Sequence, residues 1–538
     1  MSDTGNAPST SSVKTTARVD SLKNLFIDPD KQSPVRYVNT LTAASRPETR
    51  KVQRVMLISP PSTLYKGDLP RCTYPLGLGY IAAVLLESGY EVEILDCLVE
   101  GYYDTTPIKD DENFLTYGLN RAEIAKRIAA FGPDIVGVSS IFSNQSDSVA
   151  EVFRAIRMAA PDAYVATGGA HARYFPHNYI EEFDVDAVFL SESEATFLHY
   201  LEALNGHGEI EDVESLIAQK DGALIANDMM ALVRKKERNA NGFWAEIDHI
   251  PFPAWHLYNM EKYFEIGAYQ SPYTIGDRVG QIYTSRGCTA KCTFCTTTNF
   301  WGGKLRRRSP ENVVEELIAL RDGYGINEFH IQDDNITNDK AHAKHLFKYL
   351  TELNMPWCTP QGTALWRMDE ELLELMAASG CYQITFAIES GVQRVLDDLI
   401  RKPLDLDRTR HLIAYARSLG MSVHGFFIIG MPPMFGKPGE TVDEMRMTYD
   451  FAADAGFDSA SFFAATPIVG SVLLSEAMRQ GFIAKDTPLY RMSYKQGLLN
   501  VPGLWRGEEI AELAAQFNTS FNAGKTRNAR REWSQGQY

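Results

Sequence analysis

Apolar and polar positions alternate along the first half of the chain in a pattern that predicts short buried strands separated by amphipathic helices. The expected strands cover residues 52–59, 90–96, 134–139, 163–168 and 186–191. The expected helices cover residues 76–88, 121–131 and 145–159. Strands that alternate with helices at such intervals form a parallel sheet with crossover helices. The pattern therefore predicts a doubly wound, Rossmann-like α/β domain over residues 51–205, with its ligand beyond the carboxyl ends of the strands.

A second alternating series begins near Val279. Its expected strands cover residues 281–285, 328–332, 357–361, 383–388, 422–429 and 459–464, with helices such as 313–322 and 370–379 between them. Six strands are two fewer than a full (β/α)8 barrel contains. The series therefore predicts a partial (β/α)6 barrel over residues 279–480, open on one side, after a linker region at 206–278. A helical pattern near 507–523 predicts a C-terminal helical cap over 481–538, and the polar residues 1–50 predict a flexible N-terminal tail.

Composition narrows the function classes. The 538-residue chain carries a net charge of −16, which argues against a nucleic-acid-binding surface because phosphate contacts need a basic face. It contains no run of 18 apolar residues, so we expect no membrane span. It has seven cysteines, three of them clustered, and no apolar N-terminal run. This pattern favours a reduced, cytoplasmic setting over a secreted disulfide framework.

The clustered cysteines, Cys288, Cys292 and Cys295, form a C-x3-C-x2-C pattern directly after the first predicted barrel strand. Three soft thiolates suit an iron–sulfur cluster. Because a [4Fe-4S] cluster held by three cysteines leaves one iron open, that iron can chelate S-adenosylmethionine (SAM) and cleave it to a 5′-deoxyadenosyl radical. A structural zinc site usually has four ligands, often as two C-x2-C pairs, and the chain has no second pair.

Residues at the ends of the other barrel strands resemble the SAM-contacting elements of radical SAM enzymes. The aromatic residue between the last two cysteines resembles one that packs on adenine. The predicted SAM contacts are Phe294, Gln332, Asp333, Asp334, Glu389, Gly430 and Glu440. Solvent-facing loop carboxylates, and core packing of the aromatic ring, are the alternatives.

A basic segment follows the cysteines. Arg306, Arg307 and Arg308 lie together in an otherwise acidic protein. Because guanidinium groups bind phosphate and phosphonate bidentately, we predict an anion clamp for the substrate. A solvated charged face is the alternative.

A doubly wound domain ahead of such a barrel resembles the cobalamin-dependent radical SAM enzymes. The cobalamin fingerprint D-x-H-x-x-G is absent: residues 60–76 contain no histidine, and the related pattern 96–101 has Leu98 at the histidine position. We therefore expect cobalamin without a histidine ligand from that loop, and His171 as a structural residue. The predicted cobalamin contacts are Ser139, Ser140, Gly168, Gly169, Ser191 and Glu192, with glycines of ordinary tight turns as the alternative.

Five stretches resemble the C-methyltransferases of fosfomycin biosynthesis: residues 68–80, 168–176, 283–301, 329–337 and 360–369. The resemblance implies methylation of C2 of cytidylyl-2-hydroxyethylphosphonate to cytidylyl-2-hydroxypropylphosphonate. It implies a [4Fe-4S] cluster, SAM and methylcobalamin as cofactors, and a deoxyadenosyl radical that removes a hydrogen atom from the substrate. It also implies an electron donor such as flavodoxin or ferredoxin.

Other functions remain open at this point. A cobalamin-dependent radical SAM enzyme of another kind, such as a non-methylating oxidative cyclase, would have the same motifs. A sensor would need a partner or DNA-binding module, which the acidic balance opposes. A methylthiotransferase would need a further three-cysteine cluster upstream, and only Cys72 and Cys97 precede Cys288.

Overall fold

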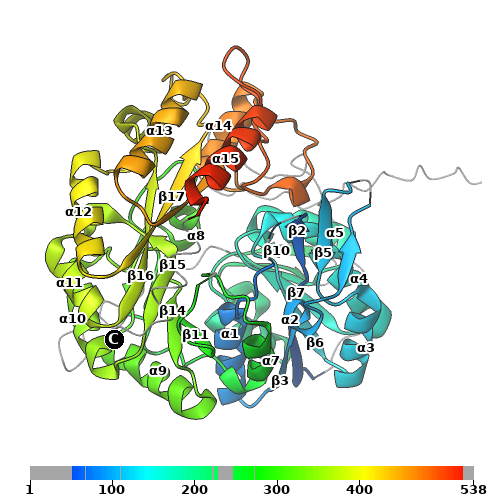
Figure 1. Cartoon of the computed structure of the whole chain (residues 1–538). Helices are drawn as coiled ribbons and strands as arrows, with labels where there is room; N and C mark the ends of the chain where they lie inside the picture. Colours follow the sequence, from blue (N-terminus) through cyan, green and yellow to red (C-terminus); the bar gives the residue numbers. More distant parts are fainter. Residues whose placement is uncertain are drawn as a thin grey trace, which may run out of the picture.

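The computed structural model describes residues 51–524, except 67, 69, 110, 221–222, 228–245 and 272. Two α/β units lie beside each other, the first coloured blue to cyan and the second green to orange (Figure 1). The predicted N-terminal tail and the last 14 residues of the predicted cap, 525–538, lie outside the described residues. None of the described helices is long and apolar enough to cross a membrane.

The first unit is built on a seven-stranded sheet in the order β10-β9-β8-β7-β6-β1-β3. Its strands are β1 (Arg54–Ser59), β3 (Glu91–Asp96), β6 (Ile135–Ser139), β7 (Tyr164–Gly168), β8 (Ala187–Phe189), β9 (Leu216–Lys220) and β10 (Ala223–Ala226). The first five are parallel, which confirms the doubly wound fold. Since β1 lies between β3 and β6, the order reverses there and creates the kind of crevice in which such sheets bind ligands.

The helices of this unit are α1 (Leu76–Glu87), α2 (Cys97–Glu100), α3 (Arg121–Phe131), α4 (Ser146–Ala159), α5 (Pro176–Phe183) and α6 (Glu194–Leu204). Three of them, α1, α3 and α4, lie where they were predicted, and α2, α5 and α6 were not predicted. Helix α3 has residues at both ends that favour its predicted bounds. The Asn120 side chain accepts hydrogen bonds from the backbone N–H groups of the first turn, and Gly132 ends the helix with a φ of 64°.

Two features of the first unit differ from the prediction. The antiparallel strands β9 and β10 extend the sheet to Ala226, so the boundary at residue 205 and the start of the linker at 206 were wrong. A small second sheet, formed by β2 (Ser62–Tyr65), β4 (Thr105–Pro107) and β5 (Phe114–Tyr117), was not predicted. Both are short antiparallel elements, whose weak periodicity is easily taken for loop.

The second unit is a six-stranded parallel sheet in the order β11-β14-β15-β16-β17-β18, as the sequence predicts. Its strands are β11 (Val279–Ile282), β14 (Glu328–Ile331), β15 (Trp357–Thr363), β16 (Cys381–Glu389), β17 (Ser422–Ile429) and β18 (Ser459–Ala464). Its helices are α9 (Pro310–Tyr324), α10 (Lys340–Leu353), α11 (Glu370–Ala378), α12 (Leu406–Ser418), α13 (Val442–Asp454) and α14 (Val472–Gln480). Strands β11 and β18 are the two edges of this partial barrel.

The C-terminal helix α15 (Gly507–Asn522) covers one of these edges. Two asparagines one turn apart on α15 pair with the free backbone of β18. Asn518 accepts from Phe462 N at 2.9 Å and donates to Phe462 O at 2.7 Å, and Asn522 makes the same pair with Ala460 at 3.1 and 2.8 Å. The side-chain amides thus replace a seventh strand and remove an exposed edge, which confirms the predicted helical cap over its described part.

The segment between the two sheets is packed rather than extended. Its helix α7 (Met260–Ile266) carries Tyr263, which stacks on Tyr74 with ring centroids 4.1 Å apart. Trp255 Nε1 donates to Glu316 on α9 at 3.0 Å. Buried apolar residues form one continuous core through both units. The two sheets are therefore held in a fixed relation by a shared interior.

Replacing Asn518 with Ala should lower the free energy of unfolding by about 1–3 kcal/mol, because the N–H and C=O groups of buried Phe462 lose their partners. Denaturant unfolding measures the change. The matched control is Thr519→Ala, since Thr519 is exposed and bonds only within its own helix. Equal stability of the two variants would contradict the edge-pairing role.

Candidate active site

The three clustered cysteines lie on the loop that follows the first barrel strand. A two-residue strand, β12 (Ser285–Arg286), precedes them and pairs with β13 (Arg306–Arg307). A short helix, α8 (Thr297–Trp301), follows them. All three thiols are half-buried and free. Burial raises the pKa of Cys292 to about 12, against the opposing influence of the Lys402 ammonium. Metal coordination deprotonates such thiols outright, so the donor set fits an iron–sulfur cluster.

Protein contacts hold this loop along its length. Thr293 donates its hydroxyl to Leu399 O at 2.7 Å and its N–H to Ile400 O at 3.0 Å, and it accepts from Leu473 N at 2.8 Å. Asp334 accepts from Gly287 N at 3.0 Å and from the Thr297 hydroxyl at 3.1 Å. The loop is thus fixed on both sides of the cysteines by neighbouring elements.

A buried ion pair lies beside the thiols. Glu389, at the end of β16, accepts from Lys402 Nζ at 2.8 Å, and both side chains are almost fully buried. Glu389 has a φ of 74°, a left-handed conformation that a non-glycine residue adopts only when its surroundings require it. Lys402 was not singled out from the sequence. Its ammonium influences Cys292 and Cys288 electrostatically, which suits a site that holds an anionic cluster.

Two of the predicted SAM contacts build loops instead. Asp333 is buried and accepts from Thr284 N, Thr284 Oγ1 and Ser285 Oγ at 2.6–2.7 Å, and burial raises its pKa to about 6. Glu440 is fully buried and accepts from the N–H groups of Gly430 and Met431 at 2.8 and 3.0 Å; burial raises its pKa to about 8. The predicted direct SAM contact is corrected for both, because the Asp333 carboxylate binds one backbone N–H group and two hydroxyl groups, and the Glu440 carboxylate binds two backbone N–H groups.

Of the other predicted SAM contacts, one is explained by packing and the rest remain predictions. Gly430 has a φ of 82°, and a Cβ there would meet Ile510 of α15 at 2.7 Å, so packing explains this glycine. Gln332 accepts from Gln361 Nε2 at 2.6 Å, and its own Nε2 has no hydrogen-bond partner in the described part of the chain. Asp334 is exposed and Phe294 is half-buried. Gln332, Asp334, Phe294 and Glu389 remain predicted contacts.

The predicted cobalamin contacts come together at the carboxyl edge of the first sheet. Ser139 and Gly168 are register partners on β6 and β7, and Ser191 lies just beyond β8. Gly169 has a φ of 112°, and a Cβ there would meet Ser140 O at 2.5 Å. The Ser140 hydroxyl itself pairs with Tyr179 Oη at 2.8 Å and is buried.

The same edge carries apolar side chains that are open to solvent. Ile141 and Phe142, in the loop after β6, are 44% and 60% exposed. Exposed apolar groups beside a glycine turn suit a large, flat cofactor such as a corrin ring. The residues present therefore fit cobalamin at this edge.

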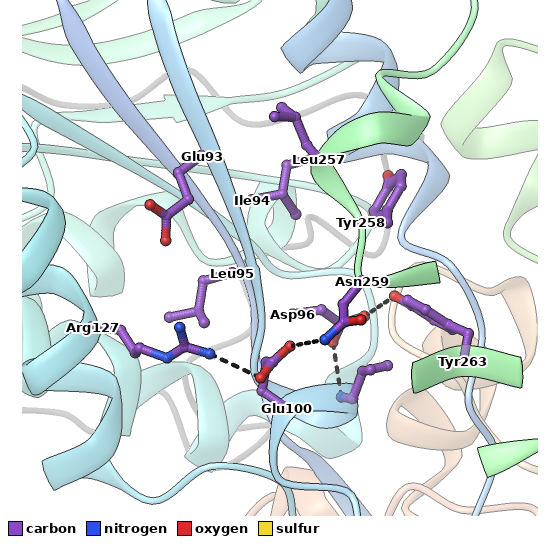
Figure 2. A pocket seen from close by; sticks show the side chains of 11 residues that line it. Glu93, Ile94, Leu95, Asp96, Glu100, Arg127, Leu257, Tyr258, Asn259 and Tyr263 are labelled. Carbon is purple, nitrogen blue, oxygen red and sulfur yellow. Dashed lines mark hydrogen bonds and ion pairs between the residues drawn. The ribbon is translucent and has the colours of Figure 1, made fainter. Parts of the chain in front are cut away.

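His171 and Asp96, which the search for a cobalt-binding histidine motif brought up, both have structural roles. His171 is buried, its Nδ1 lies 3.0 Å from Ser143 Oγ, and burial lowers its pKa to about 3. Asp96 caps α2 by accepting from Leu98 N and also accepts from Tyr263 Oη. It lines a small hollow of about 190 Å³ beside the edge strand β3 (Figure 2). Asp96 therefore holds α7 in place and is not a remnant of a cobalt-binding loop.

The three arginines do not form the predicted anion clamp. Arg306 pairs with Glu192, Arg307 pairs with Glu246 and Asp339, and Arg308 pairs with Glu316 at 2.5 Å. Each guanidinium group is already neutralised by protein carboxylates and is largely buried, so this prediction was wrong. Glu192 is likewise committed to Arg286 and Arg306, and its predicted cobalamin contact is corrected.

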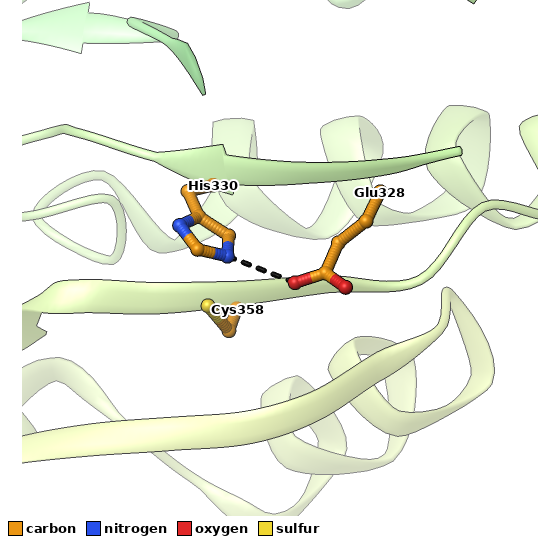
Figure 3. A group of neighbouring side chains, drawn as sticks. All are labelled: Glu328, His330 and Cys358. Atoms are coloured by element: carbon orange, nitrogen blue, oxygen red, sulfur yellow. Dashed lines mark hydrogen bonds and ion pairs between the residues drawn. The ribbon is translucent and has the colours of Figure 1, made fainter. Parts of the chain in front are cut away.

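A second group of possible metal ligands, Glu328, His330 and Cys358, lies buried on β14 and β15 (Figure 3). The Glu328 carboxylate accepts hydrogen bonds from four donors at 2.6–2.8 Å: Ile275 N, Gly276 N, Tyr382 Oη and His330 Nε2. Four donors satisfy a carboxylate fully. The group is therefore explained as a hydrogen-bonded cluster that ties the chain entering the barrel to its sheet.

Comparison with known proteins agrees with this reading of the two units. Residues 63–201 match the B12 binding domain, and residues 282–452 match the Radical SAM superfamily. The solved structure of the radical SAM methyltransferase TsrM from Kitasatospora setae, with cobalamin and a [4Fe-4S] cluster bound, superposes with a TM-score of 0.61 at 18% identity and covers 87% of this chain and 85% of that one. The fold and the cysteine site define a cobalamin-dependent radical SAM enzyme.

Curated relatives narrow the class further. Cytidylyl-2-hydroxyethylphosphonate methyltransferase from Streptomyces wedmorensis is 59% identical over 516 residues, which is 94% of this chain and 97% of that protein. The anaerobic magnesium-protoporphyrin IX monomethyl ester cyclase of Rubrivivax gelatinosus is 22% identical over 83% of this chain and 73% of its own length. The chain belongs to the family of the Streptomyces methyltransferase.

The Glu328–His330 pair predicts a pH dependence of stability. Burial lowers the pKa of His330, but contacts with Cys358 and Glu328 outweigh burial and raise it to about 9. Because the folded state prefers the protonated ring, this stabilisation is complete below about pH 6.5 and is lost as the pH rises through about 9. Denaturant unfolding should show a loss of roughly 3 kcal/mol over this range.

The control for this prediction is His330→Gln, which keeps a hydrogen-bond donor without a titrating ring. This variant should lose less unfolding free energy than the wild type between neutral and alkaline pH. The same alkaline loss in both proteins would contradict the assignment to His330.

Proposed function

We propose that this enzyme methylates C2 of cytidylyl-2-hydroxyethylphosphonate to give cytidylyl-2-hydroxypropylphosphonate, a step of antibiotic biosynthesis. The observation that carries the proposal is the 59% identity over nearly the whole of both chains, combined with a complete three-cysteine loop and a sheet edge that suits cobalamin. When bound, the cluster and SAM supply a 5′-deoxyadenosyl radical and cobalamin supplies the methyl group.

Different residues of this chain would bind the iron–sulfur cluster, SAM and cobalamin. Cys288, Cys292 and Cys295 hold the cluster, and the buried Lys402, itself paired with Glu389, influences two of these thiols electrostatically. Glu389 keeps that ammonium in place through their 2.8 Å contact. Phe294, Gln332, Asp334 and Glu389 are the residues that we propose as SAM contacts. Ser139 at the end of β6, together with Gly168 and Gly169 at the end of β7, forms the sheet edge against which cobalamin packs.

The setting follows from the same chemistry. The radical step needs an electron, so we propose a flavodoxin or ferredoxin as the donor, in the reducing environment of the cytoplasm. The substrate is a small molecule, and the net charge of −16 gives no reason to add a nucleic-acid partner.

The direct test is an anaerobic assay of protein reconstituted with iron, sulfide and methylcobalamin. With reductant, SAM and the cytidylylated hydroxyethylphosphonate, mass spectrometry should find a product heavier by one methylene unit, together with 5′-deoxyadenosine and S-adenosylhomocysteine. Cys292→Ala should form none of the three and should lack the visible absorbance of the cluster. Cys381→Ser is the matched control, because Cys381 is buried within β16.

Other outcomes have definite meanings. Deoxyadenosine without a methylated product would overturn the proposed substrate or the methyl transfer, as expected for an oxidative cyclase. Full activity of Cys292→Ala would overturn the ligand assignment.

A further inference from the structure

A neutral cluster of four buried charges joins the first unit to the cysteine loop. We call Glu192, Glu194, Arg286 and Arg306 the interdomain ion-pair cluster. Arg286 pairs with Glu192 and, at 2.7 Å, with Glu194, and Arg306 pairs with the second oxygen of Glu192. The exposed fraction of each side chain is 16% or less. One carboxylate is therefore shared by two guanidinium groups away from solvent.

The cluster connects the two places where cofactors bind. Glu192 and Glu194 follow β8, at the edge that suits cobalamin. Arg286 lies two residues before Cys288 and faces Arg306 across the β12–β13 ribbon. Gly287, between Arg286 and the cysteine, has a φ of 97°, and a Cβ there would meet Lys304 O at 2.1 Å. Because the backbone at Gly287 is packed this tightly, we expect a displacement of Arg286 to move Cys288 as well.

Aromatic rings fix the guanidinium groups from both units. The Arg286 guanidinium carbon lies 4.9 Å from the ring centroid of Tyr80 on α1, and that of Arg306 lies 5.4 Å from the ring of Trp301 on α8. Cation–π contacts favour one orientation of each group. Each arginine is thus held by a carboxylate and a ring, which leaves little freedom in the spacing between the units.

Stability alone is a weak reason for such a cluster. Burying paired charges costs desolvation energy that their attraction only partly returns, and apolar residues of the same volume often serve a fold as well. What buried ion pairs do provide is one defined geometry. A carboxylate that binds a different guanidinium group with each of its two oxygens, at the junction of two units, holds both arginines at a defined separation.

We propose that Glu192 is a positioning residue that sets the separation between the cobalamin edge and the cysteine loop, and so couples SAM cleavage to methyl transfer. This inference rests on the proposed function. Reactions between two bound groups are sensitive to displacements of about 1 Å. With the spacing relaxed, radical formation continues while methyl transfer fails more often.

The test uses Glu192→Gln in the reconstituted holoenzyme, because glutamine keeps the shape and removes the charge. We expect iron content and cobalamin content close to those of the wild type, and a lower melting temperature because the buried Arg306 loses its carboxylate partner. The ratio of deoxyadenosine to methylated product should rise about tenfold. Hydrogen exchange in the substrate-free protein should become faster in both segments 187–194 and 283–307.

Controls separate positioning from a general loss of structure. Glu91→Gln breaks an exposed ion pair with Arg54 in the same sheet and should leave the ratio and the exchange unchanged. If Glu192→Gln does not fold, Arg306→Lys keeps the charge but lacks the planar guanidinium group that lies against the Trp301 ring, and should show the same uncoupling. Faster exchange with an unchanged product ratio means a structural role only and overturns the proposal, as does no change in either. A wild type that makes no methylated product refutes the proposed function instead, and the exchange measurement then still reports whether Glu192 fixes the spacing.

Discussion

The carboxyl ends of two parallel sheets meet at one packed interface, and the rest of the structure depends on that constraint. Glu192, after β8, contacts Arg286, which lies just after β11. Arg173, after β7, donates to Asn299 O beside the cysteine loop at 3.2 Å. Ligands of parallel sheets bind beyond the carboxyl ends of the strands. Each unit therefore presents its cofactor edge to the other, and the cofactors of two separate folds share one reaction space.

Electrostatics at this interface follow from burial. The overall charge is −16, and buried charges near the cysteine loop are paired: Lys402 with Glu389, and Arg286 and Arg306 with Glu192. Unpaired charges in such a place would be costly. Because opposite charges in each pair largely cancel, these residues add little net charge near the three cysteines. Arg306, Arg307 and Arg308, which stand out in an acidic sequence, likewise pair with protein carboxylates and therefore have a structural role.

The sequence was sufficient to predict the fold, and to single out the three cysteines of one loop, because both depend on local patterns. Strand–helix alternation places the eleven parallel strands to within a few residues, and the cysteine spacing lies within one loop. It was insufficient where the partner is distant in the sequence. Nothing near Arg306 indicates that Glu192, 114 residues away, neutralises it. Nothing near Glu440 indicates that its carboxylate binds backbone N–H groups of its own loop and not SAM. Lys402 was missed because a single lysine after a helix carries no pattern.

The central claim, that the two cofactor edges face each other at close range, can be tested on the wild-type holoenzyme without substrate. Electron paramagnetic resonance of the cobalt(II) form of bound cobalamin should show faster spin relaxation when the iron–sulfur cluster is reduced to its paramagnetic state, because the two centres are close. A cobalt signal with the same relaxation whether the cluster is oxidised or reduced would contradict the account, since it would place the two cofactors too far apart to share one reaction.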